Sequence, residues 1–292
     1  FDKINMFLSI DNKRGNKLME ENLNKRKVLH PKTECLIEAL KICLYCNNST
    51  FKNNNLLQTN GTATGAPNSC SYADIAVSAI DESIYSSIYA KDLLFFGRYR
   101  DDCLCLWTGT EENLKLFFDF VNSLSEDLKF TMEVGQNMIC FLDLQISLDD
   151  NQLKTTVYSK PTDSHLYLHK DSCHKKSTIN GIQKGVALRL RRICSSDENY
   201  TEKSEEYKSY LTDRGHNSQI VDDTFKNIAN IERSDARKKK QPNSELKRII
   251  FSTKYNPRGP YIETIIKKNL PWLYNDPNMV RLFPKGSIFV AN

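Results

Sequence analysis

The sequence lacks the features that would assign the chain to a membrane or to a disulfide-bonded secreted class. No apolar run approaches the roughly 20 residues that a membrane-spanning helix requires. No basic-then-apolar segment of the kind that directs secretion opens the chain. The nine cysteines are odd in number and scattered, which indicates a reduced intracellular protein. Internal repeats and low-complexity tracts are also missing, so we expect a globular chain of one or two domains.

The charge of the chain is unevenly distributed. Residues 1–150 carry 15 basic and 21 acidic side chains, a net charge of −6. Residues 151–292 carry 26 basic and 15 acidic side chains, a net charge of +11. An acidic first half suits a carboxylate-bound metal site, and a basic second half suits a polyanion such as nucleic acid. Many basic faces are simply solvated, so charge alone leaves the function open.

Apolar periodicity predicts a mixed fold in the first half of the chain. A glycine-bearing turn over 61–67 interrupts the pattern, and Arg100-Asp101-Asp102 marks the tip of a strand pair. This order of elements predicts an α+β fold with an antiparallel sheet. The expected elements are a helix over 31–46, a hairpin over 51–57, a helix over 73–90, the strand pair over 93–107, a helix over 111–124, and strands near 128–134, 139–148 and 152–158.

The second half is richer in helices and basic residues. A three-helix unit is expected over 186–194, 199–212 and 217–231, with Gly215 in the turn before its last helix. The segment 232–245 is charged and poor in apolar residues, which favours a linker. The tail over 246–292 returns to mixed structure punctuated by prolines.

Asp101-Asp102 lies at the tip of the expected strand pair, with apolar residues on both sides. A tight tip projects consecutive side chains into one small space, where Asp2 from an adjacent strand would complete a set of hard oxygen ligands. Magnesium favours such ligands and keeps waters and substrate phosphates in its remaining positions. Asp149-Asp150 and Asp222-Asp223 look like solvated loop pairs, so a metal site and a plain exposed turn both remain open.

Several segments together resemble the motifs of reverse transcriptases. Tyr99-Arg100-Asp101-Asp102 resembles their Tyr-x-Asp-Asp box. Phe1-Asp2-Lys3-Ile4-Asn5-Met6-Phe7 resembles their first palm motif, and Gly61-Thr62-Ala63-Thr64-Gly65-Ala66-Pro67 with Ser71-Tyr72-Ala73 resembles the second. The downstream segments narrow the resemblance to the Penelope-like retroelement family. They are Phe141-Leu142-Asp143, Tyr158-x-Lys160-Pro161-Thr162 and Ala187-Leu188-Arg189-Leu190-Arg191-Arg192-Ile193-Cys194.

The resemblance implies a role for each matching position. Asp2, Asp101 and Asp102 would hold two Mg²⁺ ions that activate a primer 3′-hydroxyl and stabilise the leaving pyrophosphate. Arg100 departs from the family pattern, in which an apolar residue is more usual, and adds a cation near the metals. It is compatible with a primer contact or with a decayed copy.

The nucleotide and template would be bound by Phe7, Gly61, Gly65 and Tyr99. Phe7 falls at the position of the steric gate that favours deoxynucleotides, and core packing is the alternative. The two glycines would let the backbone approach the template–nucleotide pair closely, and a plain loop before a helix is the alternative.

The thumb would bind the nucleic-acid backbone through a basic stretch. No acidic residue occurs from His174 to Ser196, and this region resembles the helix-turn-helix element of animal Penelope-like proteins. Gripping the duplex through phosphates is favoured over reading bases. The expected contacts are Lys175, Lys176, Lys184, Arg189, Arg191 and Arg192.

The resemblance as a whole implies a right-hand polymerase fold. It comprises a palm over 1–160 without its fingers, a mainly helical thumb over 161–235, and a connection over 236–292 towards an absent GIY-YIG endonuclease. The expected activity is RNA-directed DNA synthesis, which takes deoxynucleoside triphosphates, a DNA primer and an RNA template, in the nucleus and with no membrane partner. The oligomeric state is not implied.

Three alternatives stay open beside this hypothesis. The chain is also compatible with a catalytically inactive nucleic-acid-binding remnant, or with a telomerase-like or DNA-templated polymerase.

Cys43-Leu44-Tyr45-Cys46 has the spacing of half a zinc site, but no second pair follows, which favours plain thiols on a helix. Arg237-Lys238-Lys239-Lys240 fits a nuclear localisation signal, a phosphate contact or a linker.

Overall fold

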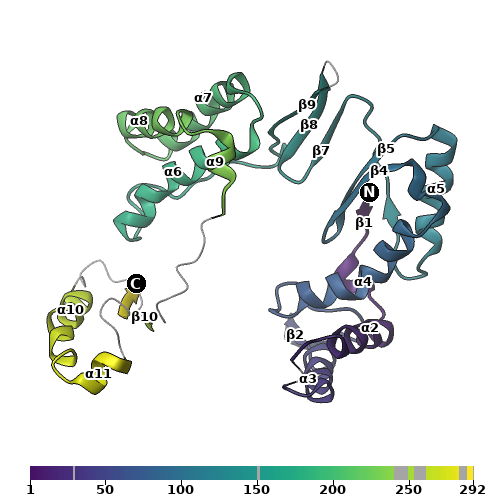
Figure 1. Ribbon diagram of the computed structural model, residues 1–292, viewed down its shortest axis with the longest axis horizontal. Helices are drawn as coiled ribbons and strands as arrows, with labels where there is room; N and C mark the ends of the chain where they lie inside the picture. Colours follow the sequence, from purple (N-terminus) through teal and green to yellow (C-terminus); the bar gives the residue numbers. More distant parts are fainter. Residues whose placement is uncertain (29, 150–151, 240–248, 253–260, 283–287, 292) are drawn as a thin grey trace. The chain divides into compact units, whose positions relative to one another are not determined.

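The computed structural model describes the chain except residues 29, 150–151, 240–248, 253–260, 283–287 and 292. Its contacts divide the chain into two units, Phe1–Gly135 and Gln136–Asn292, each of which is described by itself (Figure 1). Both units combine helices with antiparallel sheets. The predicted mixture of helix and antiparallel sheet is therefore confirmed, and a parallel strand pair near the end of the chain adds to it.

The first unit is built on a four-stranded sheet in the order β4-β5-β1-β6. The sequence-distant strand β1 (Asp2–Lys3) lies between β5 (Asp102–Trp107) and β6 (Phe130–Thr131). The outer strand β4 (Leu93–Tyr99) forms the predicted hairpin with β5, and Tyr99 pairs with Asp102 at its tip. This order brings the start of the chain beside the hairpin tip.

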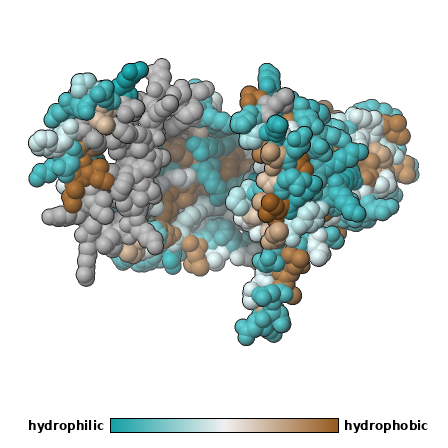
Figure 2. Space-filling view, turned by 90° about the horizontal axis from the view of Figure 1, so that it is seen from below, coloured by the Kyte–Doolittle hydropathy of each residue, from teal (hydrophilic) through white to brown (hydrophobic). Residues whose placement is uncertain are grey.

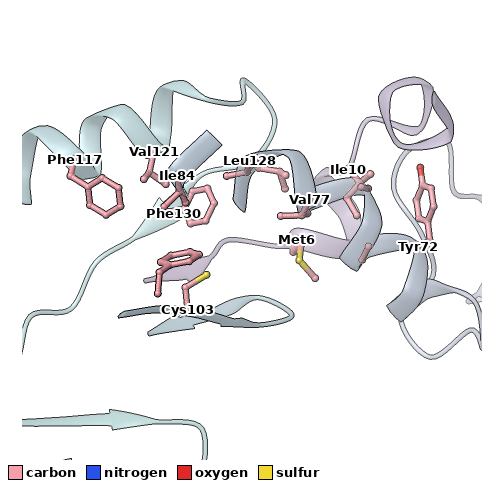
Figure 3. Close-up of a cluster of buried hydrophobic side chains, with 14 of the residues drawn as sticks. Met6, Ile10, Tyr72, Val77, Ile84, Cys103, Phe117, Val121, Leu128 and Phe130 are labelled. Carbon is pink, nitrogen blue, oxygen red and sulfur yellow. The ribbon is translucent and has the colours of Figure 1, made fainter. Parts of the chain in front are cut away.

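Helices form the core of the unit together with this sheet. Phe117 and Val121 from α5 and Val77 from α4 meet Cys103 and Phe130 from the sheet (Figure 3). Burial raises the pKa of the neighbouring Cys105 thiol to about 11, as expected for alternate cysteines on the covered face of a strand. The helices are α1 (Met6–Ser9), α2 (Asn12–Asn24), α3 (Thr33–Tyr45), α4 (Ser69–Tyr85), η1 (Ile88–Asp92) and α5 (Glu111–Ser123).

The predicted hairpin before the glycine-rich turn is formed by β2 (Asn48–Phe51) and β3 (Asn54–Leu57). Lys52 and Asn53 have left-handed backbone conformations, with φ of 47° and 65°, which suits a two-residue hairpin turn. All eight strand residues are exposed. Hydrophobic patches among hydrophilic residues are visible on the face drawn in Figure 2.

The second unit begins with a three-stranded antiparallel meander of β7 (Met138–Phe141), β8 (Leu144–Asp149) and β9 (Gln152–Val157). One strand was predicted over 139–148, but the left-handed residue Leu142, with φ of 56°, turns the chain there and makes two strands. Val157 of β9 is buried in the core of the helices that follow. The meander therefore belongs to the second unit by its contacts, and the end of the palm predicted near residue 160 stays a prediction.

Three helices complete the core of the second unit, and a short fourth helix packs against the first of them. Ser196 and Asn217 cap α7 and α8 by accepting backbone N–H bonds from Asn199 and Ile220, which explains where these helices begin. Gly215 has φ of +79° in the turn before α8, as predicted. The helices are α6 (Lys176–Ile193), α7 (Asp197–Asp213), α8 (Ser218–Ala229) and α9 (Arg233–Arg237).

The end of the chain differs from the linker predicted over 232–245. Its first part forms α9, where Ala236 is buried, while 240–248, including Lys240 of the basic run, lies outside the described residues. Beyond it, β10 (Ile249–Ser252) pairs in parallel with β11 (Ile288–Ala291). The helices α10 (Tyr261–Leu273) and α11 (Pro277–Leu282) lie between these strands in sequence.

Candidate functional site

The hairpin tip and the first strand together bring the predicted carboxylates into one place. Asp2 of β1 lies directly opposite Asp102 of β5 in the antiparallel register. The backbone N–H of Lys3 donates to the carbonyl of Asp101 at 3.2 Å. Directly opposed residues share one face of a sheet, and opposed like charges repel. A cation bound between the strands would relieve that repulsion.

A pocket of about 470 Å³ opens beside these strands. Asp2 and Asp101 both line it, together with Phe7 and Thr64. Asp102 does not line it and is the strand partner of Asp2. The pocket therefore combines two carboxylates with an aromatic side chain and a threonine from the glycine-rich turn. Its remaining lining residues are Lys3, Ile4, Asn5, Met6, Leu8 and Thr131.

The carboxylates of this pocket fit a hard cation. Two carboxylate oxygens with space for waters and phosphate oxygens are the donor set that Mg²⁺ accepts. Within the described ranges, no three His, Cys, Asp or Glu side chains form a ready-made metal cage. The predicted role of Asp2, Asp101 and Asp102 as metal ligands thus remains a prediction, supported by the shared pocket.

The glycine-rich turn forms one wall beside the pocket. Thr62 N–H donates to the carbonyl of Phe7 at 2.7 Å, and Gly61 N–H donates to the carbonyl of Ile10 at 3.2 Å. The Asn12 amide then donates to the Gly61 carbonyl at 3.0 Å. A side chain at Gly61 would meet the backbone of Phe7 and Leu8, so the close approach predicted there is to the protein's own chain.

Gly65 differs from Gly61 in its surroundings. Its φ is +95°, and a Cβ atom built on it would meet nothing within 4 Å. It directly follows Thr64, which lines the pocket. The close backbone approach of a ligand that the sequence predicts therefore has room at Gly65.

Tyr99 lies outside the pocket lining. Its side chain is exposed, and the guanidinium of Arg100 lies 5.7 Å from its ring centroid. Arg100 itself has a left-handed backbone with φ of 58°. The predicted contact of Tyr99 with nucleotide or template thus gains no support from the pocket, and the Arg100 cation is directed to its neighbour's ring.

Two cations at the hairpin tip, the buried Lys3 and the half-buried Arg98, were not predicted from the sequence. Arg98 forms ion pairs with Asp74 at 3.0 Å and Asp81 at 2.7 Å. Lys3 is 3% exposed, and burial is the main cause that lowers the pKa of its amine to about 8. The seven-residue spacing of Asp74 and Asp81, which places both on one helix face, was the available signal for an arginine partner.

The six basic residues predicted to bind the nucleic-acid backbone divide into two groups. Lys176, Lys184 and Arg192 are exposed on α6, and Lys175 is half-buried at its N-terminus. Arg192 also donates to the carbonyl of Ala236 at 2.7 Å. The exposed side chains of this group are available to phosphates.

The remaining two arginines have partners within the second unit. Arg189 donates twice to Asp143, at 2.8 and 3.1 Å, and thereby ties α6 to the β7–β8 turn. Arg191 is 7% exposed, and its guanidinium binds the Asp197 carboxylate and the Ile231 carbonyl. The burial and these partners give Arg191 a structural role, and its predicted phosphate contact gains no support from them and stays a prediction.

This division predicts opposite effects for two substitutions on α6. Arg191→Ala should lower the free energy of unfolding by about 2 kcal/mol, because a buried carbonyl and a packed stem lose their partner. Lys184→Ala should leave stability unchanged and reduce the slope of log affinity for a duplex against log salt by about one. Thermal unfolding and a salt series of duplex binding test the pair. Equal effects of both substitutions on either quantity would contradict the assignment.

The comparisons with known proteins concern the second unit. Residues 166–226 match the family model described as the animal helix-turn-helix domain. The match takes in α6 and α7 and ends within α8, so the helix-turn-helix character predicted for this region is confirmed. No curated protein matches the chain. In the part of the chain that the structure describes, no helix is both long and apolar enough to cross a membrane.

Proposed function

We propose that the chain is the palm and thumb of an RNA-directed DNA polymerase of the Penelope-like retroelement kind. The observation that supports this proposal best is the pocket shared by Asp2 of β1 and Asp101 of the turn between β4 and β5, which lie about a hundred positions apart in sequence. These are the two positions at which the motif resemblance places the principal carboxylates. The neighbouring Phe7 and Thr64 also belong to segments that resemble palm motifs.

In this proposal Asp2 and Asp101, with Asp102 beside them, hold two Mg²⁺ ions. Bound there, magnesium would supply activation of the primer 3′-hydroxyl and charge stabilisation of the leaving pyrophosphate. The protein's own contribution is to orient Asp2 from β1 and Asp101 from the turn between β4 and β5. Gly65 leaves the backbone open to the template–nucleotide pair, and the exposed lysines of α6 bind phosphates of the duplex.

Primer extension tests the proposal directly. The chain, and a version joined at its N-terminal end to the fingers of a related reverse transcriptase, would be assayed with an RNA template, a DNA primer, deoxynucleotides and Mg²⁺. Magnesium-dependent extension by either protein is the expected result. Extension on DNA but not on RNA templates would favour the DNA-templated alternative, and no extension by folded, duplex-binding protein would overturn the polymerase proposal.

Phe7 gives the proposal a specific prediction about sugar selection. Its side chain is half-buried and lines the pocket, where a ring under the incoming sugar would clash with a 2′-hydroxyl. Phe7→Ala should therefore reduce the preference for deoxynucleotides over ribonucleotides by roughly tenfold or more. Competition between the two nucleotides in single-step extension measures this ratio.

A matched control separates the gate from a general loss of packing. Phe95 on β4 is exposed and lies outside the pocket lining, so Phe95→Ala should leave the preference unchanged. If Phe7→Ala slows both nucleotides equally, Phe7 is a packing residue and the gate assignment fails.

A second candidate function is a nucleic-acid-binding protein without polymerase activity. The helix-turn-helix match over 166–226 favours it, because such helices commonly bind duplexes. This candidate predicts salt-dependent duplex binding that needs the basic residues of α6 and does not respond to magnesium. It also predicts that substitutions at Asp2 and Asp101 have no effect on any nucleic-acid activity of the chain.

A further inference from the structure

The turn that carries Asp101 has an unusual backbone. Arg100 adopts a left-handed conformation with φ of 58°, which costs a residue with a side chain roughly 1 kcal/mol or more. The carbonyl of Arg100 is joined to the Asp101 amide in one peptide group. Whatever holds that carbonyl therefore also fixes the direction in which Asp101 leaves the turn.

Two cations from different strands donate to this one carbonyl. Arg98 Nη1 lies 3.2 Å from the Arg100 oxygen, and Lys3 Nζ lies 3.4 Å from it. Lys3 is almost completely buried, and the Arg98 side chain is 12% exposed. Hydrogen bonds from charged donors are stronger than those from neutral ones, and here both are made to the residue before Asp101 at the edge of the pocket.

The Arg98 guanidinium is itself held in position by α4. Its Nε donates to Asp81 at 2.8 Å, its Nη1 donates to the Asp74 carboxylate at 3.0 Å, and its Nη2 donates to the Asp74 carbonyl at 3.2 Å. A planar guanidinium with several donors can satisfy all these acceptors together, which a single ammonium group cannot do. The turn is thereby connected to the longest helix of the first unit.

We propose that Arg98 and Lys3 are positioning residues that hold the Arg100 carbonyl and so aim Asp101 into the pocket with Asp2. This inference rests on the proposed function, because it assigns the two cations to the orientation of a metal-binding carboxylate. Neither residue transfers a proton or binds metal in this role. Their side chains act through the peptide group between Arg100 and Asp101.

The test uses two substitutions that keep the packing of the side chains. Lys3→Met removes the donor and retains an unbranched stem. The Arg100 carbonyl keeps its bond from Arg98 in this variant, and thermal unfolding checks that the variant is folded. Arg98→Lys keeps a positive charge for Asp81 but lacks the second donor for the Arg100 carbonyl. Lys129→Met is the matched control, because Lys129 donates to the carbonyls of Asn122 and Ser125 in the same unit and lies outside the pocket lining.

Two measurements on the intact chain read out the positioning. Amide hydrogen exchange over residues 98–103 should become faster in Lys3→Met and Arg98→Lys but not in Lys129→Met. Binding of Mn²⁺ as the probe ion, followed by electron paramagnetic resonance without nucleotide, should weaken roughly tenfold in the same two variants. In Asp101→Asn, adding Lys3→Met should cause no further loss of Mn²⁺ affinity.

The outcomes separate this inference from the proposed function. Variants that match the unmodified chain in both exchange and Mn²⁺ affinity would overturn the positioning role while leaving the polymerase proposal intact. If the unmodified chain neither binds Mn²⁺ nor extends primers, the polymerase proposal fails. In that case faster exchange in the variants would show a stabilising contact only, and the positioning role would fail with it.

Discussion

Replacing Asp101 with asparagine is expected to abolish magnesium-dependent primer extension, by at least about a hundredfold, while duplex affinity stays within twofold of the unmodified chain. Asparagine keeps the size of the side chain and removes the negative charge that would hold the ion. Asp101 lines the pocket with Asp2, whereas the exposed basic residues assigned to the duplex lie on α6 in the other unit. This variant should therefore lose primer extension and keep duplex binding.

The matched control is Asp223→Asn. Asp223 belongs to another Asp-Asp pair, is exposed on α8, and accepts a hydrogen bond from Gln219 at 3.0 Å. It should leave both extension and duplex affinity unchanged. Equal loss of extension and binding in Asp101→Asn would point to a folding defect, which unfolding curves would reveal. Unchanged extension in a folded Asp101→Asn protein would remove Asp101 from the chemistry.

Much of the local structure could be predicted from sequence because local rules determine it. The strand pair over 93–107 has apolar residues on both sides of a polar tip, and it forms β4 and β5 as expected. Cys103 and Cys105 share the covered face, as strand alternation requires. Gly215 takes the positive φ that the turn before α8 needs. Each of these features depends on neighbours a few positions away.

Other features depend on contacts between distant segments, which periodicity does not reveal. Arg191 sits in a basic stretch that suggested phosphate binding, yet its partners Asp197 and Ile231 hold it in the interior. Lys3 belongs to the first motif-like segment, and the strand order places it in the inner strand β1, where it is buried. The helix α2 over Asn12–Asn24 was not predicted, because polar residues dominate its sequence.

The candidate pocket also combines features that the local sequence predicts with features that depend on distant segments. That Asp101 and Asp102 lie at a tip follows from the local pattern. That Asp2 pairs with Asp102 requires the chain to return across a long stretch of sequence, and only the motif resemblance anticipated it. The contact of Gly61 with the backbone of Phe7 and Leu8 was not anticipated.

Gly61→Ala is expected to destabilise the first unit by about 3 kcal/mol or more. Its φ of +68° is unfavourable for alanine, and the new Cβ would lie 2.7 Å from the Leu8 carbonyl oxygen and closer still to that of Phe7. The turn cannot easily move away from Phe7 and Leu8, because Gly61 N–H and Thr62 N–H are hydrogen-bonded to carbonyls of the same segment. The cost of the backbone strain and the cost of the steric overlap therefore add.

Gly65→Ala provides the comparison that isolates the overlap. It has the same kind of backbone strain, with φ of +95°, but its Cβ would enter open space, so the expected loss is only about 1 kcal/mol. Trp107 stacks on Phe117 in the core of the first unit, and its fluorescence in a Trp272→Phe background reports unfolding of that unit alone. Thr64, which lines the pocket, belongs to the same turn as Gly61. If Gly61→Ala lowers the free energy of unfolding much more than Gly65→Ala, the packing of this turn against Phe7 and Leu8 shapes the pocket. Equal losses of unfolding free energy in the two variants would mean that the turn does not pack against Phe7 and Leu8 and does not help to form the pocket.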